Sequence, residues 1–99
     1  MRDMNTPQYI AWRRKVFRRD KYKCQFPGCT NTGPINSHHI FMYAKYPALR
    51  FNINNGICLC IQHHNLVTGN EEQYEAMFTN IIRNKSFNMK ALRVLRGIE

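Results

Sequence analysis

The four histidines of this chain stand as two adjacent pairs, His38-His39 and His63-His64, and Asn55 lies between the pairs. Histidine is the commonest metal ligand in proteins and the side chain best suited to proton transfer near neutral pH. If His38 and His39 lie on a strand, their side chains leave in opposite directions, so one can ligate a metal while the other accepts a proton. The two pairs therefore predict one assembled active site.

The cysteines around these pairs predict a second, structural metal. Cys24-x4-Cys29 and Cys60-x2-His63 have spacings that suit a four-coordinate zinc. If a helix starts at Cys60, residues three apart share one face of it. His64 is then rotated by about 100° from its neighbour and points to a different side.

Cys58 is a fifth candidate for four ligand positions, and we expect it to be a small buried apolar residue instead. Disulfides are the alternative for these cysteines, but they belong to oxidising compartments. The N-terminus lacks the apolar segment of a secretory signal, and no stretch approaches the ~20 apolar residues that span a bilayer. We therefore expect an intracellular, cytoplasmic protein with reduced thiols.

The charge of the chain is strongly positive. Fifteen Lys and Arg against six acids give a net charge of +9 at pH 7, and the basic residues cluster near both ends. Such clusters are typical of nucleic-acid-binding proteins, although a solvated helix surface would look similar. The candidate nucleic-acid contacts are Arg13, Arg14, Arg18, Arg19, Lys21, Lys23, Lys90 and Arg93, with Arg50 a weaker candidate for which a structural salt bridge is equally compatible.

The 99 residues predict one domain with a small core, divided into segments 6–20, 21–69 and 70–99. Thr6 and Pro7 open a first amphipathic helix as N-cap and first helical residue. The centre is expected to run strand (35–42), turn (52–56), strand (57–60) and short helix ended by Gly69. Two further helices are predicted, at about 70–84 and 88–96.

The order His39, Asn55, His64, set inside the Cys-Cys and Cys-His pairs, resembles the HNH endonucleases, or ββα-metal nucleases. The resemblance runs from about Trp12 to Gly69 and extends to small phage-type or homing-type members. The strings that carry it further are Arg19-Asp20-x-Tyr22-x-Cys24, Tyr46-Pro47-x-Leu49-Arg50-Phe51 and Asn55-Gly56-Ile57-x-Leu59-Cys60.

This resemblance implies an α+β fold, a small zinc-stabilised ββα-metal core with flanking N- and C-terminal helices. It implies that His39 is the general base, that Asn55 holds the loop and orients His39 through a hydrogen bond, and that His38 and His64 hold one catalytic Mg²⁺ or Mn²⁺. The structural zinc ligands would be Cys24, Cys29, Cys60 and His63.

The implied activity is hydrolysis of DNA, double-stranded as the expected partner, to 5′-phosphate and 3′-hydroxyl ends. A monomer would nick one strand, and double-strand cleavage would need a homodimer or a phage or host partner protein.

The chain departs from the family at three places: His63 replaces the usual fourth Cys, Cys24 and Cys29 are four residues apart rather than two, and Thr68 stands where many relatives carry a third metal-binding His. Two protein ligands would then hold the catalytic metal. The alternative function is a non-catalytic zinc-stabilised nucleic-acid-binding module, which would not need His39. A disulfide-bridged secreted toxin is a third hypothesis.

Overall fold

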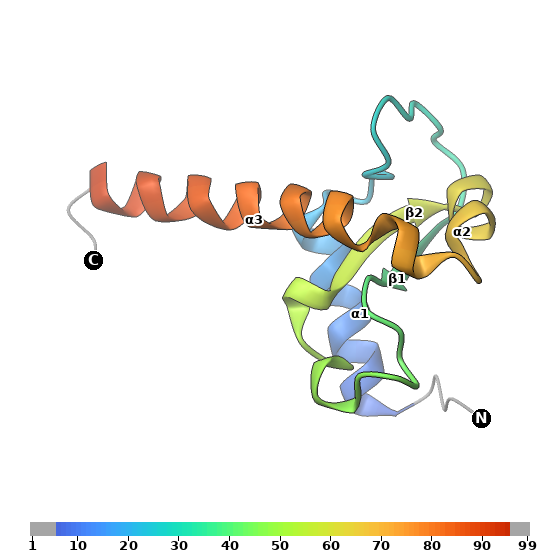
Figure 1. Ribbon diagram of the computed structural model, residues 1–99. Coiled ribbons are helices and arrows are strands. Elements are labelled where there is room, and N and C mark those ends of the chain that lie inside the picture. The colour runs from blue at the N-terminus through green and yellow to red at the C-terminus, as the bar shows by residue number, and fades with distance from the viewer. Residues whose placement is uncertain (1–5, 96–99) are drawn as a thin grey trace.

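The computed structural model describes the backbone of residues 6–95 and the side chains of residues 6–85. Within this part, three α-helices and a two-stranded antiparallel sheet form an α+β fold (Figure 1). In chain order the elements are α1 (Pro7–Arg19), β1 (Ile35–His39), β2 (Gly56–Cys60), α2 (Ile61–Val67) and α3 (Glu71–Leu95), with two short 3₁₀ turns, Pro47–Leu49 and Ile53–Asn55, between the strands.

The first helix begins where the sequence predicts. The Thr6 side chain accepts a hydrogen bond from the backbone N–H of Tyr9 at 3.3 Å, and Pro7 is the first helical residue. The face of α1 that contains Trp12 and Val16 is buried, because apolar residues recur there at helical spacing. This face packs closely on the start of β2: a Cβ added at Gly56 would lie 2.7 Å from the Trp12 ring and closer still to Val16.

The two strands pair with a fixed register in which Ile35 lies opposite Cys60 and His39 lies opposite Gly56. We expected β1 to continue to residue 42, but it ends at His39. The reason is that the chain beyond His39 bonds to Asn55 in the connection between the strands: the Ile40 N–H donates to the Asn55 backbone carbonyl at 3.0 Å, and the Phe41 N–H donates to the Asn55 side-chain oxygen at 2.7 Å. The chain therefore leaves the sheet directly after the second histidine.

The short helix α2 follows β2 without a loop. Its N-cap is Cys60, whose sulfur accepts a hydrogen bond from the backbone N–H of His63 at 3.5 Å. Gly69 lies just past its end with φ of +87°, a conformation that glycine adopts without the strain that a Cβ would cause. The strand-strand-helix order of the centre, and its end near Gly69, are as predicted.

The C-terminal region corrects the prediction of two helices, because α3 is one continuous helix of 25 residues. Between Glu71 and Leu95 there is no Gly or Pro, and the Asn and Ser residues near position 86 each weaken a helix by only about 0.5 kcal/mol. Phe78 and Ile82 are buried against Ile57 and Leu59 of β2. The C-terminal half of α3 extends beyond the rest of the chain (Figure 1). No helix in residues 6–95 combines the length and apolarity needed to cross a membrane.

The end of α1 is fixed by the buried carboxylate of Asp20. This carboxylate accepts hydrogen bonds from Arg19 and from the backbone N–H of Cys58, each at 2.9 Å, and it pairs with Lys85 of α3 at 3.1 Å. The guanidinium of Arg19 also donates to the backbone carbonyls of Ile53 and Gly56. Asp20 thereby joins α1, β2 and α3.

Candidate metal centre and histidine cleft

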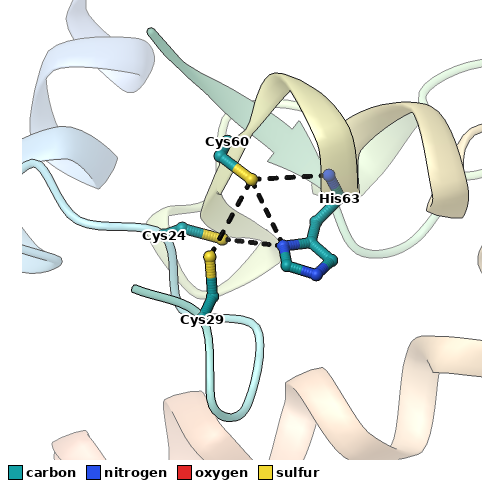
Figure 2. Close-up of side chains that lie close together, drawn as sticks. All are labelled: Cys24, Cys29, Cys60 and His63. Carbon is teal, nitrogen blue, oxygen red and sulfur yellow. Dashed lines mark hydrogen bonds between the residues drawn. The ribbon is translucent and has the colours of Figure 1, made fainter. Parts of the chain in front are cut away.

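Four side chains converge on one point as the cysteine spacing predicts (Figure 2): Cys24, Cys29, Cys60 and His63. One ligand atom from each lies within 4.8 Å of all the others. The Sγ atoms of Cys29 and Cys60 are 3.9 Å apart, and His63 Nδ1 lies 3.2 Å from the Cys60 sulfur and 3.6 Å from the Cys24 sulfur. Ligands of a tetrahedral zinc are about 3.5–3.8 Å apart, so these residues lie close enough to bind a metal such as zinc.

Local structure explains why the four ligands meet. The turn that carries Cys24 and Cys29 is closed by a hydrogen bond from the Cys29 N–H to the Phe26 carbonyl at 3.0 Å. The Phe26 ring stacks on the His63 imidazole with centroids 4.1 Å apart. The side-chain amide of Asn31 donates to the Cys60 sulfur at 3.3 Å. Sequence reasoning did not identify Phe26 or Asn31, because neither is a metal ligand itself.

The thiols of this cluster differ in acidity. Burial alone would raise the pKa of Cys60, but hydrogen bonds from the Asn31 amide and the His63 backbone N–H outweigh it and lower the pKa to about 6. Burial raises the pKa of Cys24 to about 11. A thiolate at Cys60 is thus available near neutral pH to receive a metal. Cys58 lies outside the cluster and is fully buried, as predicted, and this burial raises its pKa to about 12.

The other histidines line a separate cleft of about 690 Å³ between α1, β1 and the α2–α3 connection. His38, His39 and His64 all contribute to its wall, together with Arg13 and Arg14 of α1. The adjacent pairs are therefore divided as predicted: His63 faces the cysteines, and His64 faces the cleft.

The His38 side chain on β1 contacts the His64 side chain on α2. Their Nδ1 atoms are 3.1 Å apart, and the His38 side chain is only 6% exposed. Two neighbouring ligands of an octahedral divalent cation also lie about 3 Å apart. A hydrogen bond between the two rings gives the same separation when no metal is bound.

His39, the next residue of β1, packs against α1 in the wall of the same cleft. Its ring stacks on Trp12 with centroids 4.0 Å apart and planes 9° from parallel. Its Nε2 atom lies 2.9 Å from the backbone carbonyl of Arg50. Since a carbonyl only accepts, Nε2 carries the proton, and Nδ1 is then the basic nitrogen of the neutral ring.

Asn55 fulfils only part of the role expected of it. Its side chain accepts from the Phe41 N–H at 2.7 Å and donates to the carbonyls of Phe41 and Leu49 at 3.1 Å each, so it holds the loop between the strands. His39 Nε2 is oriented instead by the hydrogen bond that it donates to the Arg50 carbonyl, because the ring faces the 3₁₀ turn that ends at Leu49. Both donor hydrogens of the Asn55 amide are already used by backbone carbonyls.

The hydrogen-bond partners differ among Thr68, Arg50 and Arg19. Thr68 lines the cleft, and its hydroxyl donates to the His64 carbonyl at 2.6 Å. Arg50 forms no described salt bridge; it donates to the Tyr43 carbonyl at 2.7 Å and lies over the Tyr43 ring. Arg19 is held by Asp20 and two carbonyls, so its setting is structural, and its contact with nucleic acid stays a prediction.

The remaining candidate contacts are exposed where the structure describes them: Arg13, Arg14, Arg18, Lys21 and Lys23. The side chains of Lys90 and Arg93 lie outside the described residues.

Scans against models of protein families and searches of curated proteins and solved structures found no match. The geometry of the two sites therefore carries the functional argument.

Proposed function

We propose that the protein is a metal-dependent endonuclease of the HNH type that hydrolyses DNA phosphodiester bonds. The observation that carries the proposal is the presence of three histidines in one cleft, in two different settings: the paired His38 and His64, and the stacked His39. A zinc-stabilised binding module needs the cysteine cluster and the basic residues, but it does not need this arrangement of imidazoles.

Hydrolysis of a phosphodiester needs a deprotonated water and stabilisation of negative charge on the phosphate and the leaving oxygen. A divalent cation held by His38 and His64 would supply that stabilisation. Arg13 and Arg14 line the same cleft, so their charges favour the approach of the anionic backbone of DNA.

His39 is the proposed general base. With its proton held on Nε2 by the Arg50 carbonyl, the ring has its basic lone pair on Nδ1, a buried atom that the attacking water must reach to pass on its proton. Water attacks phosphorus and its proton passes to His39, while the bond from phosphorus to the 3′ oxygen breaks. The leaving 3′ oxygen takes a proton from solvent water, which leaves 5′-phosphate and 3′-hydroxyl ends. The stacking contact with Trp12 fixes the plane of the His39 ring. A general base that is held in one orientation meets its substrate at a defined angle.

The order of elements supports the same assignment. The first two histidines end β1, Asn55 closes the connection to β2, and His64 lies on the helix that follows β2 directly. This arrangement is the strand-strand-helix order that the resemblance implies. The metal cluster of Cys24, Cys29, Cys60 and His63 packs beside that helix and provides the proposed zinc site.

Nicking of supercoiled plasmid in the presence of Mg²⁺ or Mn²⁺ tests the proposal. We expect His39→Gln to lower the nicking rate about 10²–10⁴-fold, the range that a general base contributes, with unchanged zinc content and DNA affinity. The matched control is Asn54→Gln, at an exposed position of the connection between the strands, which should nick like wild type.

Two results would contradict the proposal. One is equal nicking by wild type and His39→Gln, which would point to a contaminating nuclease. The other is zinc-loaded wild type that binds DNA but does not nick it with either metal, which would leave the non-catalytic binding module as the function.

A further inference from the structure

Glu71 brings a carboxylate to the histidine cleft. Among the described residues that line the cleft it is the one acidic side chain, and it lies in the first turn of α3. Its side chain is 14% exposed, and that of His38 beside it is 6% exposed. Charges in such weakly hydrated surroundings interact more strongly than they do in bulk water.

The two oxygens of this carboxylate have different neighbours. Oε1 accepts a hydrogen bond from the backbone N–H of Gly69 at 2.9 Å, which fixes the side chain at the start of α3. Oε2 lies 3.8 Å from Nε2 of His38. At this separation the carboxylate acts on the imidazole through its charge rather than through a direct hydrogen bond.

His38 therefore has a carboxylate at one ring nitrogen and His64 at the other. Nε2 faces Glu71, and Nδ1 lies 3.1 Å from Nδ1 of His64. A neutral imidazole carries its proton on one nitrogen and a lone pair on the other. A negative charge beside Nε2 favours the proton there and leaves the lone pair on Nδ1, the nitrogen that faces His64.

We propose that Glu71 is a positioning residue of the catalytic metal site, which selects the tautomer in which His38 Nδ1 can ligate a divalent cation. This inference rests on the proposed function, which assigns His38 and His64 to the metal. Histidine ligands commonly face a carboxylate with their other nitrogen, and loss of such a carboxylate typically weakens metal binding 10- to 100-fold.

Glu71 also bears on the absent third histidine. The Thr68 hydroxyl donates to the His64 carbonyl, so it is already engaged in α2. Glu71 lies beyond the edge of the His38 ring that faces away from His64, so the carboxylate does not replace a third ligand directly. It supports metal binding by making His38 a better donor.

The test compares Glu71→Gln with Glu72→Gln in full-length, zinc-loaded protein. Glutamine at 71 keeps an oxygen for the Gly69 N–H and removes only the charge. Glu72 lies in the same turn, but it is exposed and pairs with Lys45, so its variant matches the charge change away from the cleft. Two readouts are needed: the ¹⁵N shifts of the His38 ring at about pH 8, where histidine is neutral, and Mn²⁺ affinity by calorimetry.

We expect wild type and Glu72→Gln to hold the His38 proton on Nε2, and Glu71→Gln to shift toward a mixture of tautomers and bind Mn²⁺ about 10- to 100-fold more weakly. Equal tautomer populations and equal Mn²⁺ affinity in all three proteins would overturn the inference and leave Glu71 as a helix cap only. Wild type that binds no Mn²⁺ at His38 and His64 would instead overturn the proposed function itself.

Discussion

The neighbours of the ring nitrogens differ between His38 and His39, and they decide what each ring can do. The Nε2 atom of His39 is held by the Arg50 carbonyl, which assigns its proton and leaves Nδ1 as the base. The Nδ1 atom of His38 faces His64, and its Nε2 faces Glu71. In the proposed function, proton transfer and metal binding thus belong to adjacent residues of one strand.

The loop that supplies the Arg50 carbonyl depends on Asn55, so substitution of Asn55 should affect both stability and activity. Asn55→Ala removes three hydrogen bonds from a side chain that is buried, and leaves backbone groups of Phe41 and Leu49 without these partners. We expect a loss of about 1–3 kcal/mol in the free energy of unfolding and slower nicking, because the Arg50 carbonyl would no longer be fixed against His39.

Urea unfolding followed by circular dichroism, together with the plasmid assay, measures both effects. Asn54→Ala is the matched control, because Asn54 is the exposed neighbour of Asn55. An Asn55→Ala protein as stable and as active as the Asn54→Ala protein would show that the loop does not depend on this side chain.

The sequence predicts the positions of the zinc ligands, but it does not predict the contacts that support the histidines of the cleft. Cys60-x2-His63 follows from the one-turn spacing of a helix, which is a local property. Glu71 and the Arg50 carbonyl reach the histidines only through the packing of α3 and the path of the loop, which no local spacing encodes. The hydrogen bond expected from Asn55 to His39 was misassigned for the same reason.

The cysteine cluster connects two segments that lie far apart in the sequence. It ties the turn at Cys24 and Cys29 to the start of α2, and the Phe26 ring of that turn contacts both His63 and Phe78 of α3. The core is small, so the proposed zinc should supply a large share of its stability.

Loss of one zinc ligand should therefore release the metal and destabilise the fold. We expect Cys29→Ala to lose bound zinc and to unfold at a clearly lower temperature, because the three remaining ligands no longer close the site. Cys58→Ala should keep zinc and cost only about 1 kcal/mol, since Cys58 is buried outside the cluster. Zinc content by atomic absorption and thermal melts measure the difference; equal zinc content in the two variants would refute the proposed ligand set.

The boundaries of the elements follow from the sequence where a cap or a breaker is present. Thr6 and Pro7 start α1, and Gly69 follows the end of α2, because each supplies a specific backbone conformation or hydrogen-bonding group. The prediction of two helices, at about 70–84 and 88–96, was wrong, since α3 is continuous from Glu71 to Leu95. Polar residues interrupt an apolar stripe without interrupting the backbone hydrogen bonds.

On the scale of the whole molecule, the positive charge is divided between structural and exposed roles. Arg19 neutralises the buried Asp20 and fixes α1 to β2, whereas Arg13 and Arg14 face the cleft that contains the histidines. Arg13 and Arg14 thus lie beside the proposed catalytic site, and we expect them to direct the phosphate backbone toward it.

A salt titration of DNA binding should distinguish the exposed Arg14 from Arg19, which is paired with the buried Asp20. We expect Arg14→Gln to reduce the magnitude of the slope of log affinity against log salt by about 1, because one phosphate contact is lost, with little change in the melting temperature. Arg19→Gln should leave the slope unchanged and cost about 1–3 kcal/mol of stability, because the buried Asp20 loses one partner and keeps Lys85 and the Cys58 N–H. Fluorescence anisotropy with a labelled duplex in EDTA-free buffer at several KCl concentrations, paired with thermal melts, measures both quantities. The reverse pattern, in which Arg19→Gln changes the slope and Arg14→Gln does not, would show that DNA approaches a face of the molecule other than the histidine cleft.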